Sequence, residues 1–191
     1  MNTLYFGDNL SVLRTNVKDE SVDLIYLDPP FNSQANYNML FEEKGEAIEA
    51  QVEAFRDTWE WEQSAAESYD DVLKAAGDLS IVLKGFKAWL GQSAMMAYLA
   101  MMAVRLLELR RVLRPTGSLY LHCDPKASHY LKIILDAIFG HESFRNEIVW
   151  RRSTGKSLMT RRLPTNHDTI LMYAGQDHVW HGDGAFIPYD P

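Results

Sequence analysis

The stretch "LIYLDPPFNS" at residues 24–33 places an acid, two prolines and an aromatic residue directly after a run of strand-forming residues. Proline cannot donate to a strand ladder or continue a helix interior, and Pro30 forces Pro29 into an extended conformation. We therefore expect residues 28–31 to form a stiff loop at the carboxyl end of a strand. In open α/β sheets that end of the strands is where ligands bind.

The residues around this loop have the pattern of a βαβ unit. "TLYF" at 3–6 predicts a short strand, and Asp8 is a plausible cap for a short helix after it. "SVDLIYL" at 21–27 predicts a second strand, apolar enough for the buried middle of a sheet. Strand, helix and strand in this order indicate an α/β fold.

The middle of the chain predicts helices. Apolar residues between 46 and 76 recur at spacings of three and four, which favours one or two amphipathic helices ending near Gly77. Trp59 and Trp61 are interpreted as packing anchors of this insertion rather than base-stacking groups. Ser93 can cap a long helix to about Leu113.

The pattern after this long helix predicts a strand and a further helix. "RPTG" at 114–117 supplies a helix stop and turn, and "SLYLHC" at 118–123 predicts a third strand. Asp124 can then cap a helix that starts near Pro125 and ends before Gly140. This helix has the apolar spacing of one that packs on a sheet: Leu131, Ile134, Leu135 and Ile138.

Beyond about residue 145 the pattern changes to separated strands. "EIVW" and "TILMY" (169–173) are divided by a polar, basic segment. We therefore place a boundary near 145–150, with a helical insertion at about 40–92 in the first part. The prediction is one region at 1–145 and a second at 146–191.

Composition narrows the class of protein. The chain has 191 residues, 47% hydrophobic, and its one cysteine excludes an internal disulfide or a cysteine-cluster metal site. The longest apolar run, at 94–104, stops at Arg105, well short of the roughly 18–20 residues that a membrane span needs. We expect a cytoplasmic protein with no membrane partner and no bound metal.

Charge is unevenly distributed along the chain. The formal net charge is −7, yet residues 42–78 hold twelve acids against three cations, while residues 151–162 hold five cations and no acid. Such a basic run is often only a solvated loop. Beside a ligand-binding loop it predicts contact with the phosphates of a polyanion. The predicted contacts are Arg151, Arg152, Lys156, Arg161 and Arg162.

The loop at 28–31 has groups suited to an exocyclic amine such as N6 of adenine or N4 of cytosine. The lone pair of such an amine is conjugated into the ring, so two acceptors must draw on its N–H bonds. Asp28 and a carbonyl of Pro29 or Pro30 can be that pair. Phe31 can stack on a base that has been flipped out of a duplex.

Asp8 has two possible roles. It can cap the helix that follows, or it can accept a hydrogen bond from an adenosine amine, with Asn9 beside it. The sequence leaves both open.

Six blocks in order resemble the S-adenosylmethionine-dependent amino-methyltransferases of DNA: "GDNLSVL", "SVDLIYLDPPFNSQANYN", "ELRRVLRPTGSLYLHCDP", "SHYLKIILDAIFG", "FRNEIVWRR" and "NHDTILMY". They are most similar to the circularly permuted class, in which the catalytic half comes first. The resemblance implies a Rossmann-like sheet, incomplete in this chain, with Asp28, Pro29, Pro30 and Phe31 as the catalytic motif. It also implies S-adenosylmethionine as cofactor and a DNA target-recognition region beginning at about 146. An acid at the first motif position favours adenine over cytosine.

One element of the family is absent. A glycine-rich cofactor loop of the form F-x-G-x-G does not occur in the sequence, and in the permuted order it follows the recognition region. We therefore expect an amino-terminal fragment or split subunit that is inactive alone. Double-stranded DNA is the expected partner, with a restriction subunit or a carboxyl-terminal continuation carrying the glycine loop as further candidates.

Several of the residues allow other interpretations. "HCD" at 122–124 suggests a metal or nucleophile site, but capping by Asp124 and packing by His122 and Cys123 fit its position better. His167 and Asp168 are interpreted as structural. A zinc nucleobase deaminase needs more than one cysteine. A methyltransferase of RNA or of a protein amide, and a DNA-binding partner without catalysis, stay open as alternatives.

Overall fold

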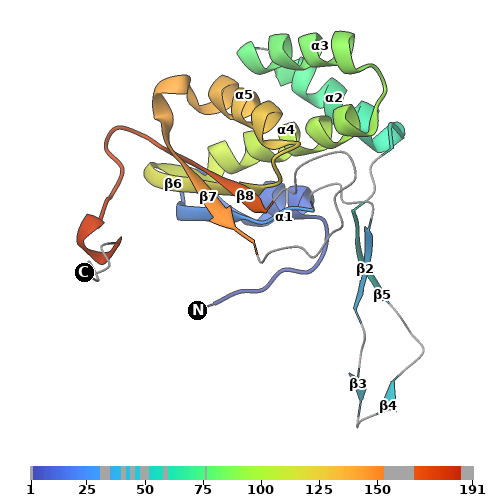
Figure 1. Ribbon diagram of the computed structural model, residues 1–191, viewed down its shortest axis with the longest axis horizontal. Coiled ribbons are helices and arrows are strands. Elements are labelled where there is room, and N and C mark those ends of the chain that lie inside the picture. The colour runs from blue at the N-terminus through green and yellow to red at the C-terminus, as the bar shows by residue number, and fades with distance from the viewer. Residues whose placement is uncertain are drawn as a thin grey trace.

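The structure is a computed structural model that describes residues 2–30, 60–75, 77–152 and 166–185, together with the backbone of four short strands between 35 and 57. Figure 1 shows a sheet covered by a layer of helices, with a two-stranded ribbon extending away from them. Within the described residues no helix is both long enough and apolar enough to cross a membrane.

The main sheet has four strands in the order β1-β6-β8-β7. These are β1 (Val22–Leu27), β6 (Leu113–Cys123), β8 (His167–Ala174) and β7 (Phe144–Arg151). β1 runs parallel to β6, whereas β8 runs antiparallel to both β6 and β7. The carboxyl ends of β1, β6 and β7 and the amino end of β8 therefore meet at one edge of the sheet.

The helices pack on the sheet in two tiers (Figure 1). The short helix α1 (Asn9–Asn16), the long helix α4 (Ala94–Val112) and α5 (Ser128–Phe139) supply residues to the core around the sheet. Helices α2 (Gln63–Ala75) and α3 (Asp78–Leu90) pack against α4 and α5. Short 3₁₀ turns lie at His141–Ser143 and Gly182–Ala185.

The core follows from the alternation of side chains along β6. Leu119, Leu121 and Cys123 are fully buried, whereas the residues between them are only partly buried. The buried face meets α4 and α5, whose leucines, isoleucines and methionines complete one hydrophobic cluster. The side chains on one face of β6 are thus buried under the helices, and those on the other face are not, which is the period-two alternation of a strand.

Several predicted elements are confirmed. The strands at 21–27, 118–123, 147–150 and 169–173 are present, as are the helices on either side of β6. Ser93 caps α4 by accepting from the Met96 N–H at 3.2 Å, and Gly140 ends α5 at φ +85°. The α/β fold class is confirmed, with a Rossmann-like sheet that is incomplete within the described residues.

The boundary predicted near 145–150 falls inside β7. Because β7 and β8 pair in the same sheet as β1 and β6, the described part of 146–191 extends that sheet. The division into a catalytic part and a recognition part stays a prediction.

Three details of the predicted strands and turns are wrong. Residues 3–6 form no strand, since no described strand pairs with them, and Leu4 is 96% exposed. β1 lies at the edge of the four-stranded sheet rather than in its middle. "RPTG" is not a turn after α4, because the chain enters β6 directly at Leu113.

The helix predicted over the first half of 46–76 is also wrong. Here β5 (Val52–Asp57) pairs antiparallel with β2 (Ala35–Met39), and β3 (Glu42–Glu43) pairs with β4 (Glu46–Ala47). Four apolar residues cannot separate a helix from a strand by spacing alone, and a partner strand decides the outcome. In the register Phe55 is opposite Tyr37 and Val52 is opposite Met39.

The second half of the insertion is helical, as predicted. Gly77 follows α2 and has φ +81°, a conformation that favours glycine. Trp61 is a packing anchor: its ring meets Tyr69 edge-on at 5.9 Å, and the Lys87 ammonium lies 3.0 Å from its centroid. Trp59 lies outside the described residues.

Candidate active site

The loop after β1 presents its acid to solvent. Asp28 directly follows Leu27, the last residue of β1, and its side chain is 63% exposed. Pro29 and Pro30 are half-buried and restrict the backbone that follows. Phe31 lies outside the described residues. The predicted stiff loop therefore places a carboxylate at the carboxyl edge of the sheet, where it is accessible to a ligand.

Asp28 is the first member of a row of polar side chains. His122 Nδ1 lies 3.1 Å from Asp28 Oδ1, and His122 Nε2 lies 3.4 Å from Asp168 Oδ2. Arg152 Nε donates to Asp168 Oδ2 at 2.6 Å, and a second guanidinium N–H donates to Oδ1. We name Asp28, His122, Asp168 and Arg152 the edge row.

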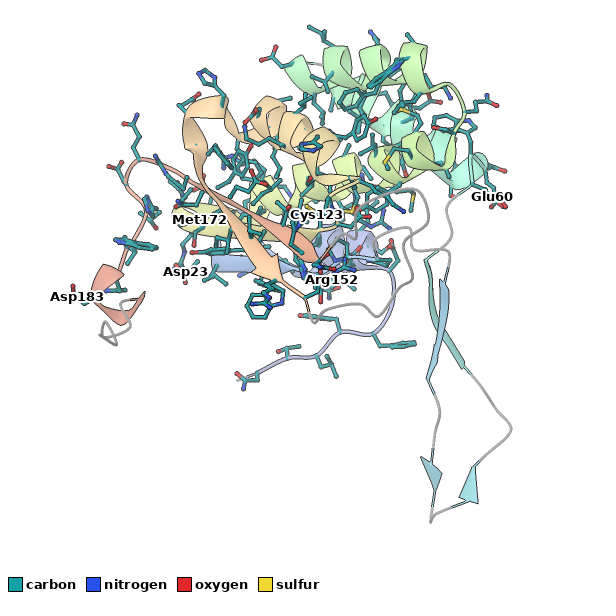
Figure 2. All side chains as sticks on the ribbon, viewed as in Figure 1. Asp23, Glu60, Cys123, Arg152, Met172 and Asp183 are labelled. Carbon is teal, nitrogen blue, oxygen red and sulfur yellow. The ribbon has the colours of Figure 1, made fainter. Side chains whose placement is uncertain are left out.

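The sheet topology explains why these four residues meet. Asp28 follows β1, His122 is near the end of β6, Asp168 is near the start of β8, and Arg152 follows β7. Their order across the sheet is the strand order. Figure 2 labels Arg152, which follows β7, and Cys123, which ends β6. Each strand thus contributes one polar side chain to the edge.

Burial falls along the row from Asp168 to Asp28. The Asp168 side chain is 8% exposed and that of His122 is 16% exposed, against 63% for Asp28. Burial works to raise the pKa of Asp168, but the hydrogen bonds and charge of Arg152, aided by His122, outweigh it and lower that pKa. The same hydrogen bond raises the pKa of Arg152. The most buried member of the row, Asp168, is therefore held as a carboxylate by the half-exposed guanidinium of Arg152.

The residues around the row have structural roles. Cys123 is fully buried, and this burial raises its pKa to about 12, so it packs in the core as predicted. Asp124 caps the turn before α5, since its Oδ1 accepts from the Ala127 N–H at 2.9 Å. Within the described residues no group of three or more His, Cys, Asp or Glu side chains could hold a metal ion.

Sequence reasoning missed the interior part of the row. His122 was predicted to pack and Asp168 to be structural without an assignable third partner, whereas both lie in one row with Asp28. A signal for His122 existed, because parallel strands bring their carboxyl ends to the same edge. None existed for Asp168, because its place depends on β8 running antiparallel between β6 and β7.

The two residues predicted to contact the cofactor, Asp8 and Asn9, both interact with the side chain of Arg105. Asp8 caps α1, accepting from the Ser11 N–H at 3.3 Å, and it pairs with Arg105 at 2.5 Å. Arg105 also donates to Asn9 Oδ1 at 2.8 Å. Burial works to raise the pKa of Asp8, but Arg105 and two backbone N–H donors together hold it below its usual value. The capping role is confirmed, and cofactor contact stays a prediction.

Of the five predicted phosphate contacts, the structure describes Arg151 and Arg152. Arg151 ends β7 and is exposed, whereas the guanidinium of Arg152 is paired with Asp168. Lys156, Arg161 and Arg162 lie outside the described residues. DNA contact stays a prediction for all five, and the pairing of Arg152 gives it a second role inside the sheet.

Comparison with known proteins gives these observations a family context. A family model described as DNA methylase matches residues 22–184. The Type III restriction-modification enzyme StyLTI Mod subunit of Salmonella typhimurium is 29% identical over 175 residues, which cover 91% of this chain and 24% of that protein. The Type II methyltransferase M.EcaI of Enterobacter cloacae is 27% identical over 182 residues, which cover 94% of this chain and 31% of that protein.

A third relative agrees with these two. The Type III restriction-modification enzyme EcoP15I Mod subunit of Escherichia coli is 25% identical over 169 residues, covering 87% of this chain and 23% of that protein. The chain thus spans about a quarter to a third of the length of these curated relatives, 24%, 31% and 23% in turn.

Proposed function

Because the chain belongs to the DNA methylase family of N6-adenine and N4-cytosine methyltransferases, we propose that it carries the acceptor-binding part of a DNA methyltransferase. The enzyme transfers a methyl group from S-adenosylmethionine to an exocyclic amine of a flipped base, N6 of adenine in preference to N4 of cytosine. The observation that carries this proposal is the position of Asp28: an exposed carboxylate on a proline-stiffened loop, at the ligand-binding edge of the sheet.

The loop acts on the amine through two acceptors. Asp28 and a carbonyl of Pro29 or Pro30 accept from the two N–H groups and draw the nitrogen toward a tetrahedral geometry. Its lone pair is then free of the ring to attack the methyl carbon that S-adenosylmethionine would supply when bound. The S–CH3 bond would break as the N–C bond forms, S-adenosylhomocysteine would leave, and one N–H proton would be released to solvent. The loop orients the amine and places the negative charge of fixed acceptors beside it.

A base inside a duplex cannot reach this loop, so the proposal includes base flipping at a cost of a few kcal/mol. Phe31 offsets part of this cost by stacking, which is worth roughly 1–3 kcal/mol and tolerates any base. The basic residues at 151–162 contact phosphates and hold the duplex against the edge of the sheet.

The described residues do not make a complete site for the methyl donor. Asp8 and Asn9 are engaged by Arg105, and F-x-G-x-G does not occur in the sequence. We therefore assign no step to the cofactor on these residues. The chain is inactive alone in this proposal, and a continuation with the glycine loop, or a second subunit, completes it. Two relatives are Mod subunits of restriction-modification enzymes, which makes a restriction subunit a further partner. The single cysteine fits a cytoplasmic location.

The test is transfer of labelled methyl groups to duplex DNA. It compares the chain alone with the protein made from the full coding sequence that contains it. We expect incorporation only by the full protein, with N6-methyladenine as the product in a nucleoside digest. N4-methylcytosine would change the base assignment. Methylation of RNA or of a protein amide in place of DNA would contradict the substrate, and DNA binding without methyl transfer by either sample would indicate a non-catalytic binding partner.

A further inference from the structure

We propose that His122 is a positioning residue for methyl transfer, which fixes the Asp28 carboxylate in the orientation that receives the amine. The proposal rests on the proposed function. It is carried by the edge row, in which His122 lies between the exposed carboxylate of Asp28 and the buried carboxylate of Asp168, which is paired with Arg152.

Asp28 needs such a restraint because the loop fixes only its backbone. The two prolines hold the chain direction, but a side chain that is 63% exposed is free to change rotamer in water. The ring nitrogen 3.1 Å from Oδ1 occupies one carboxylate oxygen and limits rotation of the group. The other oxygen, Oδ2, is then the one directed to the amine.

His122 can serve as this restraint because it is itself held. Its side chain is only 16% exposed, and its second nitrogen lies 3.4 Å from Asp168 Oδ2. Asp168 in turn is clamped by two donors of Arg152. The orientation of Asp28 is thereby tied to β6, β8 and β7, which are rigid parts of the sheet.

Two conservative variants separate the contacts of the ring. In His122→Asn the amide nitrogen stands near the position of Nδ1, so a donor toward Asp28 is kept. In His122→Gln the amide reaches the position of Nε2, so the contact toward Asp168 is kept and the one toward Asp28 is lost. Because a misplacement of about 1 Å can cost about 10²-fold in rate, we expect His122→Gln to lower kcat by about that factor. His122→Asn should retain within about tenfold of the parent kcat.

The experiment measures methyl transfer by the protein made from the full coding sequence. The parent is compared with His122→Gln and with His122→Asn. His141→Ala is the matched control, a histidine that is 88% exposed on the turn after α5. KM for DNA and for the cofactor should stay within about threefold in every His122 variant, because a positioning residue acts on the rate through Asp28 and not on the binding of either ligand. In the Asp28→Asn background His122→Gln should cause no further loss, since residues that act as one unit are not additive.

The outcomes separate this inference from the proposed function. An unchanged rate in Asp28→Asn would contradict the proposed function itself. If Asp28→Asn is slow but His122→Gln is as fast as the control, or if the two losses multiply, His122 does not act through Asp28. Should His122→Gln fail to fold, the Nδ1 resonance of His122 is compared between the parent chain and Asp28→Asn. A shift is expected, and an unchanged resonance would overturn the proposal.

Discussion

β1 and β6 are neighbouring parallel strands with similarly apolar sequences, but they have different surroundings. β6 lies between two strands and buries Leu119 and Leu121 completely. β1 pairs only with β6 among the described strands, and its Leu24 and Tyr26 are 58% and 55% exposed. Stability therefore resides in β6 and its helices, whereas the candidate chemistry lies at the end of the exposed strand β1.

The edge row connects these two environments. Asp28 is placed by β1 and is open to a substrate, while His122 and Asp168 belong to the inner strands. An accessible acid therefore has rigid support without being buried itself. Substitutions can test this division, in which β6 stabilises the sheet and β1 presents the carboxylate of Asp28.

The largest expected effect on stability is a core truncation. Leu121→Ala on β6 removes a fully buried side chain and should lower the free energy of unfolding by about 2–5 kcal/mol. Leu24→Ala on β1 is the matched control, with an expected change of about 0.5 kcal/mol or less because the side chain is mostly exposed. Urea unfolding of both variants measures this. Equal losses would mean that the two strands do not differ as described.

Asp168→Asn should have a smaller effect that depends on pH. The variant removes the charged partner of Arg152 and one of the two carboxylates beside His122, and we expect a loss of about 1–3 kcal/mol at pH 7. Because the folded-state pKa of Asp168 lies below its ordinary value of 3.8, the stability it contributes is complete above that value. This contribution is lost as the pH falls through the lower folded pKa.

Urea unfolding of the parent chain and Asp168→Asn at pH 7 and at pH 3 gives the measurement. The difference between the two proteins should shrink at pH 3, because this pH lies below the ordinary value of 3.8, so the carboxyl takes up a proton in the unfolded chain and the contribution of Asp168 is no longer complete. A difference that is the same at both pH values would show that the ion pair with Arg152 contributes nothing to stability.

The smallest expected effect concerns the other outer strand, β7, which leads into the basic segment. Replacing Arg161 and Arg162 with alanine should reduce the log–log slope of DNA affinity against salt by roughly 0.9 for each phosphate contact removed. Replacing Lys18 and Lys84, two exposed cations outside that segment, should leave the slope as it is. If both pairs change the slope equally, the segment has no special contact with DNA.

The parts of the fold that the sequence predicted are those with local signals. α4 and α5 have long apolar periods with Ser93 before one and Gly140 after the other, and β6 has a clear alternation of buried residues. The strand β5 was mistaken for part of a helix over 46–76, because only its pairing with β2 decides that it is a strand. The exposure of β1 was missed for a similar reason, since an edge strand and a central strand have the same apolar composition.

The candidate site divides in the same way. Two prolines after a strand are enough to place Asp28 at a carboxyl edge, and the structure places it there. The assignment of His122 and Asp168 required the order of four strands, which depends on contacts between residues far apart in sequence. Phe31 and three of the predicted phosphate contacts lie outside the described residues, so their roles stay predictions.

The central claim is that the carboxylate at the end of β1 acts on the amine of an extruded base. Its most direct test uses the protein made from the full coding sequence and carrying Asp28→Ala. Methyl incorporation into duplex DNA is measured, and the affinities for cofactor and for DNA are measured on the same sample. We predict loss of methyl transfer by at least about 10²-fold, with both affinities within a few fold of the parent. Methyl transfer at the parent rate by a folded Asp28→Ala protein would contradict the account.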